Sequence, residues 1–150
     1  MFSNTEIEMI RVITEEIFPG SNEARAYEFI QRDAAANPFM IGLYREGLRA
    51  FENQARLLFG KTLLDLDQER LIELLKSQEH TPFFQFIRNH TMEGVFSDPI
   101  YGGNYQAYGW RLIGFEGPRF YTAEEINKKR QLPKVYYSLK GIAHEDKTGI

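Results

Sequence analysis

The chain has 150 residues, enough for one domain that buries roughly two-thirds of the surface exposed by its unfolded state. It contains no cysteine, which excludes disulfides, thiolate iron–sulfur clusters, zinc fingers and c-type haem attachment. The formal net charge of −3 argues against nucleic acid as the main partner, and no apolar run approaches the ~20 residues of a membrane span.

Two helices are expected before residue 38. Ser3 and Glu6 form a capping-box pattern ahead of a stripe of isoleucines, which FPGS at residues 18–21 ends. Ser21 is expected to cap the second helix. Asn37 and the proline after it then end that helix and cap the next one.

Three further helices complete the expected bundle. Apolar residues recur at helical spacing from residue 38 to residue 59, and Gly60 suits a left-handed C-terminal cap. Asp67 is expected to cap a fourth helix, and Thr81, followed by proline, a fifth. On the fifth helix, His90 lies on the stripe that faces the core. Short connections favour antiparallel packing, so the predicted fold is all-α, a small bundle of about five main helices.

A long segment rich in glycine and aromatic residues follows, HTMEGVFSDPIYGGNYQAYGWRLIGFEGPR, from His90 to Arg119. After Phe96 it keeps neither a helical nor a strand period. The Gly-Gly-Asn run at residues 102–104 tolerates positive φ and predicts a tight reversal. Because its aromatic side chains are too apolar for a disordered linker, we expect an ordered loop over residues 90–118 that the chain itself or another molecule covers.

Residues 119–150 differ in character from the rest. They hold seven basic and four acidic residues, whereas residues 1–118 hold eleven and seventeen. Thr122 and Glu125 form a capping-box pattern for a short helix, after which Pro133 favours extended structure. We therefore expect a helical domain over residues 1–118 and an extended C-terminal arm over residues 119–150, which covers its own domain or reaches a partner.

Few residues have a spacing that suits chemistry. His90 and Glu93 match half of a di-metal pattern, but there is no second copy, so a core histidine satisfied by hydrogen bonds is favoured. Glu93, near a helix C-terminus, is expected to accept hydrogen bonds from loop amides. Glu93 and Asp98 beside aromatic platforms also suit a glycosidase, although Asp98 followed by proline is a common turn start. Residues 102–104 lack the spacing of a phosphate loop, and no catalytic, cofactor-binding or metal residue is predicted.

The segment from His90 to Pro118 closely resembles the signature of the gluconate 2-dehydrogenase subunit 3 family. The resemblance extends more faintly through IFPG near Ile17, the helix over residues 44–59 and LLDLDQERLIELL, so that it covers about residues 5–118. The shared elements are His90 to Gly94, Phe96, Asp98-Pro99, Tyr101-Gly102-Gly103-Asn104, Gly109-Trp110, Ile113-Gly114-Phe115 and Gly117-Pro118.

The resemblance implies a non-catalytic small (gamma) subunit of a bacterial FAD-dependent sugar or polyol dehydrogenase. Its partner would be a large flavoprotein subunit similar to glucose–methanol–choline oxidoreductases, which carries the FAD and passes electrons towards a cytochrome c. The small subunit would assist folding, maturation or export of that partner and hold no cofactor itself. The resemblance implies a periplasmic complex. The sequence has no twin-arginine signal, and a cytoplasmic complex is the alternative.

Aromatic anchors on a rigid loop suit a permanent interface. Trp110 and Phe115 equally suit the protein's own core. The alternative to an accessory subunit is a stand-alone carbohydrate-binding protein or enzyme that uses Glu93, Asp98, His90 and the aromatic loop. The residues expected at the partner interface or in bracing the loop are His90, Glu93, Asp98, Tyr101, Asn104, Tyr105, Tyr108, Trp110, Tyr136 and Tyr137.

Overall fold

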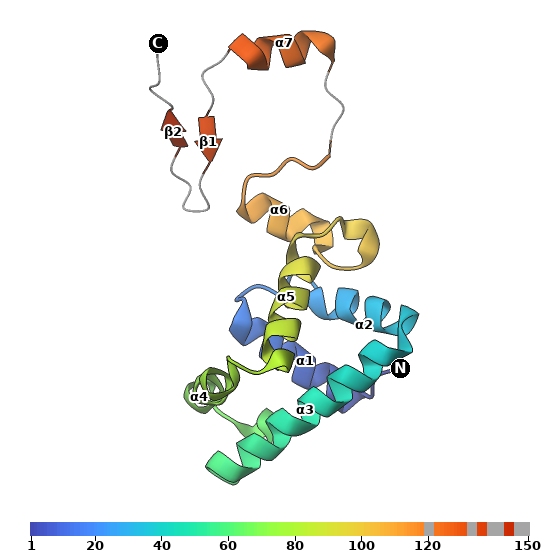
Figure 1. Ribbon diagram of the computed structural model, residues 1–150, viewed down its shortest axis with the longest axis vertical. Coiled ribbons are helices and arrows are strands. Elements are labelled where there is room, and N and C mark those ends of the chain that lie inside the picture. Colours follow the sequence, from blue (N-terminus) through green and yellow to red (C-terminus); the bar gives the residue numbers. More distant parts are fainter. Residues whose placement is uncertain (119–121, 132–134, 138–142, 146–150) are drawn as a thin grey trace. The chain divides into compact units, whose positions relative to one another are not determined.

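The computed structural model describes residues 1–118, 122–131, 135–137 and 143–145. The chain divides into two compact units, residues 1–109 and 110–150, so the boundary lies nine residues before the position that the sequence suggested. The elements are α1 (Asn4–Ile17), α2 (Ala26–Ala36), α3 (Pro38–Phe59), η1 (Leu63–Asp65), α4 (Gln68–Gln78), α5 (Pro82–Phe96), η2 (Pro99–Tyr101), η3 (Tyr105–Ala107), α6 (Tyr108–Leu112), α7 (Ala123–Gln131), β1 (Val135–Tyr137) and β2 (Ala143–Glu145) (Figure 1).

Local caps account for most helix starts in the first unit. The Ser3 hydroxyl accepts a hydrogen bond from the Glu6 amide, and the Glu6 carboxylate accepts one from the Ser3 amide at 2.7 Å. Asn37 caps α3, which ends at Gly60 with φ +66°. Asp67 and Thr81 cap α4 and α5. These predicted boundaries are confirmed.

The predicted start of the second helix is wrong. Residues 18–25 form a compact turn, and α2 begins only at Ala26. The Ser21 hydroxyl does not cap this helix, because it donates to the Glu15 carboxylate at 3.3 Å. The same carboxylate accepts hydrogen bonds from the Gly20 and Asn22 amides at 2.8 and 2.9 Å. The turn is thus held by a side chain from the preceding helix.

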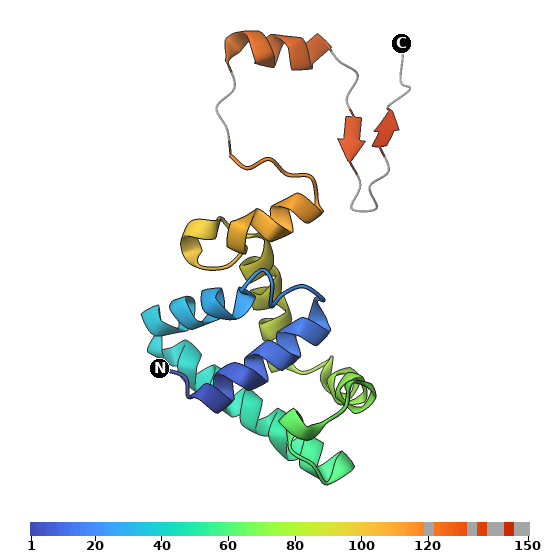
Figure 2. The same ribbon diagram turned by 180° about the vertical axis from the view of Figure 1, so that it is seen from behind.

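The core lies among the helices of the first unit, which confirms the predicted all-α bundle. Figures 1 and 2 show α3 running along one side of this unit, with α1, α2 and α5 packed against it. Tyr44 and Phe51 of α3 are fully buried, and Gly47 lies between them where the Phe83 ring packs closely on the α3 backbone. A smaller apolar cluster forms where α5 ends, around Ala24, Ala26 and Val95, with Phe18, Phe96 and Tyr108 packed against it.

The second unit contains α7 and a two-stranded antiparallel pair. Thr122 and Glu125 form the predicted capping box, with the Thr122 amide donating to the Glu125 carboxylate at 2.8 Å. Strand β1 pairs with β2, with Val135 opposite Glu145. The sequence indicated extended backbone here but not that two strands would pair. Across the described ranges, no helix is both long and apolar enough to cross a membrane.

Candidate functional site

The predicted loop after α5 is built from short turns of helix. It contains η2, η3 and the start of α6, and Gly102 and Asn104 between them have φ of +104° and +48°. Gln106 and Ala107 also have positive φ, at +52° and +56°. Single turns separated by left-handed residues are too short to leave a helical period, which explains why the sequence indicated an irregular loop.

Asn104 holds this segment together from inside. It is completely buried, and its amide donates to the Gly94 carbonyl at 2.7 Å. Its side-chain Nδ2 donates to the Ser97 carbonyl at 2.7 Å, while its Oδ1 accepts from the Gly109 amide at 2.8 Å. Asn104 therefore connects Gly94 and Ser97, at the end of α5, to Gly109 in α6. Its side chain presents no surface to a partner.

Glycines in the segment permit direct backbone packing. A Cβ at Gly103 would lie 2.1 Å from the Gly94 carbonyl oxygen, and one at Gly109 would lie 2.1 Å from the Val95 carbonyl oxygen. A Cβ at Gly94 would approach Ala26 to 2.9 Å. No side chain fits at these distances without movement of the backbone, so these glycines let the segment pack directly on α5, and α5 on the start of α2.

The turn over residues 18–25 belongs to the same site, although it lies about 80 residues earlier in the sequence. The Tyr105 amide donates to the Ala24 carbonyl at 2.9 Å, and the Arg25 guanidinium lies 3.6 Å from the centre of the Tyr105 ring. Phe18 packs edge-on against Phe96 with ring centres 5.6 Å apart. Sequence analysis did not identify Arg25, because a single arginine before a helix carries no recognisable pattern.

His90 is a buried core histidine with both ring nitrogens engaged. Its Nδ1 lies 2.8 Å from the Tyr44 hydroxyl, and its Nε2 lies 3.1 Å from the Asp33 carboxylate. Burial lowers the pKa of His90, against the opposing effect of the nearby Asp33 and Glu93 carboxylates. Burial likewise raises the pKa of Tyr44 well above its ordinary value. With Tyr44 and His90 both neutral, each has a hydrogen-bond partner when the Tyr44 hydroxyl donates to Nδ1 of His90 and the Nε2–H of His90 donates to the Asp33 carboxylate.

Metal binding finds no support in this arrangement. In the ranges that the structure describes, there is no group of three or more histidine and acidic side chains that would hold an ion. Sequence analysis missed both partners of His90, because Tyr44 and Asp33 lie 46 and 57 residues away and the helical stripe indicates burial without identifying contacts.

Asp98 and Glu93 have separate roles. The Asp98 carboxylate accepts from the Ile100 amide at 3.0 Å and caps η2, as the turn interpretation expects. Glu93 is exposed and, within the described residues, accepts none of the hydrogen bonds that we expected from loop amides. Its carboxylate instead lines a shallow hollow of about 530 Å³ whose other lining residues are Phe29, Asp33, Phe96, Ser97 and Tyr101.

The three residues of the enzyme alternative therefore do not converge. His90 is buried beneath Asp33, Asp98 closes a turn, and only Glu93 lines the hollow. An acid and base pair needs both carboxyl groups to face one substrate position. His90 and Asp98 instead make hydrogen bonds within the chain, whereas a glycosidase would need these groups free to act on a substrate.

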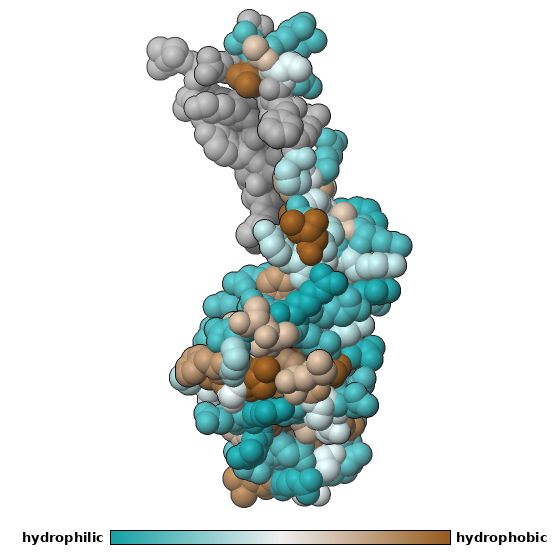
Figure 3. Space-filling model, turned by 90° about the vertical axis from the view of Figure 1, so that its right-hand side faces the viewer, coloured by the Kyte–Doolittle hydropathy of each residue, from teal (hydrophilic) through white to brown (hydrophobic). Residues whose placement is uncertain are grey.

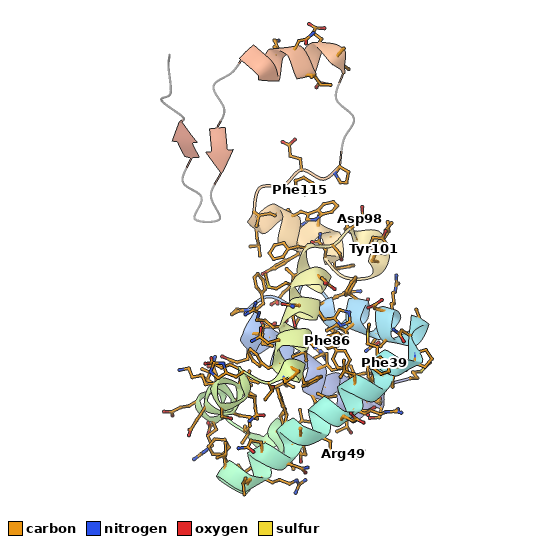
Figure 4. All side chains as sticks on the ribbon, viewed as in Figure 1. Phe39, Arg49, Phe86, Asp98, Tyr101 and Phe115 are labelled. Atoms are coloured by element: carbon orange, nitrogen blue, oxygen red, sulfur yellow. The ribbon has the colours of Figure 1, made fainter. Side chains whose placement is uncertain are left out.

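Aromatic and aliphatic side chains of the segment differ in exposure. Ile100 is 73% exposed and Tyr101 58% exposed, and Tyr101 projects from the loop that also carries Asp98 (Figure 4). Tyr105 is 41% exposed, whereas Tyr108 is partly buried against the small apolar cluster of the first unit. Their role at an interface stays a prediction.

In the second unit, Trp110 is partly buried and packs edge-on against Phe115, with ring centres 5.1 Å apart. Phe115 is nevertheless 47% exposed, so the interpretation that both rings fill the protein's own core does not hold for Phe115. The predicted anchors Tyr136 and Tyr137 belong to β1, but their side chains lie outside what the structure describes.

Another apolar surface is formed by residues of α1, α2 and α3. Figure 3 shows a band of apolar surface across the first unit, seen from the right of Figure 1. The first unit also has a mainly apolar groove, and its lining includes Met1, Phe2, Ile7, Arg32, Ala34 and Ile41. This groove contains no ionisable pair, and it does not include any residue of the segment after α5.

One family model, described as gluconate 2-dehydrogenase subunit 3, matches residues 4–117. The match covers the complete helical bundle and the segment from His90 to Gly117, and it confirms the resemblance that this segment indicated. No curated protein and no solved structure matches the chain.

Proposed function

Because the chain belongs to the gluconate 2-dehydrogenase subunit 3 family, we propose that it is the non-catalytic small subunit of an FAD-dependent sugar or polyol dehydrogenase complex. The family name identifies a subunit of a dehydrogenase, and its members associate with other subunits. In our proposal a large flavoprotein subunit carries FAD and oxidises the substrate, and a cytochrome c accepts the electrons. The complex works in the periplasm.

The observation that supports an accessory role is how the polar side chains of the segment after α5 are used. His90, Asp98 and Asn104 are engaged in hydrogen bonds within the chain. The same segment presents Ile100 and Tyr101 to solvent on a backbone that these bonds hold in place. A surface of this kind suits recognition by shape and apolar contact, in which a few anchors contribute most of the binding energy.

The small subunit then acts by stabilising its partner. Binding to the folded large subunit lowers the free energy of that state alone, which raises the yield of folded, flavin-loaded protein. This effect requires no reacting group on the small subunit. We propose that folding, maturation or export of the flavoprotein depends on this interaction.

The test is coexpression with a candidate large flavoprotein subunit. The two chains should purify together in a fixed ratio, with flavin absorbance in the complex and none in the isolated small subunit. Ile100→Ser should lower the yield of complex, whereas Leu57→Ser, at an equally exposed position of α3, should not. Flavin or sugar oxidation in the isolated chain, or failure of the chains to associate, would contradict the proposal.

Binding of a carbohydrate by the isolated chain is the second candidate, because the hollow combines Phe29 and Tyr101 with two carboxylates. Titration of the isolated chain with glucose and gluconate separates the two functions. A dissociation constant below about 1 mM that Tyr101→Ala abolishes would favour the carbohydrate-binding alternative.

A further inference from the structure

The hollow between α2 and α5 brings together two carboxylates and several aromatic rings. Asp33 comes from α2, Glu93 from α5 and Tyr101 from η2, and the Phe29 and Phe96 rings complete the walls. A second hollow continues past Tyr101 and is lined by Phe29, Arg32, Asp33, Ala36, Ile100 and Tyr101. The two most exposed apolar side chains of η2 therefore border an acidic surface.

Neither carboxylate is neutralised within the described part of the chain. The only ion-pair contact of Asp33 there is with His90, 3.1 Å away, and Glu93 has none. His90 cannot supply a lasting positive charge, because its burial lowers its pKa. Arg32 lies nearby but its guanidinium donates to the Ile100 carbonyl at 3.4 Å and its side chain lies against Gly102.

Ser97 is a further polar residue of the lining. Its hydroxyl oxygen is inaccessible to solvent and has no hydrogen-bond partner among the described residues, although Ser97 lines the hollow. A buried hydroxyl without a partner is uncommon in a folded protein, since it forfeits the hydrogen bonds it makes to water when the chain is unfolded. Because solvent does not reach this oxygen, a ligand in the hollow would contact it only after a local movement of Ser97.

We propose that this hollow receives an arginine side chain of the large subunit. The proposal rests on the proposed function, in which the partner covers the face that Ile100 and Tyr101 border. Covering Asp33 and Glu93 without a cation would leave two unpaired charges in a poorly solvated interface, which is strongly unfavourable. A guanidinium pairs with both carboxylates, and its flat faces stack on aromatic rings.

Arginine fits this site better than lysine. A guanidinium is planar, carries five donors in a fixed fork and is weakly hydrated, so it loses less than an ammonium when it leaves water. The Phe29 and Tyr101 side chains both line the hollow and offer aromatic rings for such stacking. The site is also held in position before binding, because His90 holds Asp33 and the Asn104 hydrogen bonds hold the segment that carries Tyr101.

The experiment measures the affinity of the full chain for the large subunit by surface-immobilised binding kinetics. Glu93→Gln and Asp33→Asn each remove one charge and keep the shape, and the amide oxygen that Asp33→Asn introduces would still accept a hydrogen bond from His90 Nε2. Each should raise the dissociation constant by about tenfold or more, mainly through faster dissociation. Glu73→Gln makes the same charge change at an exposed position of α4 and should change it by less than about twofold.

Several outcomes decide the proposal. Unchanged melting temperatures of the isolated variants would show that a loss of affinity does not come from unfolding. If wild type binds and both Glu93→Gln and Asp33→Asn bind within about twofold of it, the proposal is wrong. If wild type itself does not bind the large subunit, the proposed function fails first.

The chain's own basic residues are the competing occupant. Replacing Lys128, Lys129 and Arg130 by glutamine in the full chain tests this directly. If that change removes the effect of Glu93→Gln, the hollow is occupied by the second unit of the same chain and the proposal is overturned. If the effect of Glu93→Gln persists, a guanidinium of the partner is supported. Replacing the responsible arginine of the large subunit by lysine should then weaken the complex as well.

Discussion

Replacing Asn104 by alanine should destabilise the first unit by about 2–5 kcal/mol. The Gly109 amide would lose its acceptor while buried, which costs about 1–3 kcal/mol. The hydrogen bond to the Ser97 carbonyl is only partly buried, and its loss would cost about 0.5–1.5 kcal/mol. Alanine also tolerates the φ of +48° less well than asparagine does.

Two related variants separate these contributions. Asn104→Gly removes the same hydrogen bonds but relieves the left-handed backbone, so it should cost less than Asn104→Ala. Asn104→Asp keeps the acceptor for Gly109 and places an oxygen against the Ser97 carbonyl. That contact and burial should raise the pKa of the new carboxyl above its unfolded value, so this variant should lose stability as the pH rises and regain it in acid.

The assay is thermal unfolding followed by circular dichroism, together with hydrogen exchange read by mass spectrometry. At roughly 4 °C per kcal/mol, the alanine variant should melt about 8–20 °C below wild type. Exchange should accelerate first in residues 97–109. A variant with an unchanged melting temperature and unchanged protection in this segment would refute the argument that Asn104 holds it in place.

Three further predictions concern close packing and the buried histidine. Gly109→Ala should cost more than about 2 kcal/mol in urea unfolding, because its Cβ would meet the Val95 carbonyl, whereas Gly42→Ala, which meets nothing within 4 Å, should be neutral or stabilising. His90→Gln should cost about 1–3 kcal/mol and leave the substrate preference of the complex unchanged, since its contacts are structural; a complex of normal stability with turnover a thousandfold lower would contradict this. The contribution of His90 to the free energy of unfolding should be complete above pH 6.5, the usual pKa of unfolded histidine, and should be lost as the pH drops towards the lower pKa of folded His90. A pH profile of stability that His90→Gln does not flatten would contradict this.

Helix boundaries could be predicted where a cap is local in sequence. Ser3, Asn37, Asp67 and Thr81 each bond an amide two or three residues ahead, so the pattern that predicts the cap contains both partners. The prediction that Ser21 caps the second helix failed because the Ser21 hydroxyl bonds to the carboxylate of Glu15, six residues earlier. Nothing in the FPGS pattern indicates that Glu15 faces it.

Residue types in the candidate site could be identified from sequence, but their contacts could not. Asp98 and the stripe position of His90 followed from local rules. The neighbours of Glu93 depend on how α2 packs across α5, which places Asp33 in the same hollow from 60 residues away. The expectation that Glu93 would bond to loop amides failed because Asn104 and Gly94 make the contacts that hold the loop.

Two sets of hydrogen bonds position residues that line the hollow. Asn104 holds the segment that carries Tyr101, and His90 holds the Asp33 carboxylate, yet the two sets share no hydrogen-bonding group. A partner that binds here does not need to order either wall, so the entropic cost of association is reduced. Loss of Asn104 should therefore weaken the complex even though its side chain is buried and touches no partner. This effect, unlike that of Glu93→Gln, should be insensitive to salt, because it changes the population of the binding-competent loop and leaves the charge of the surface unchanged.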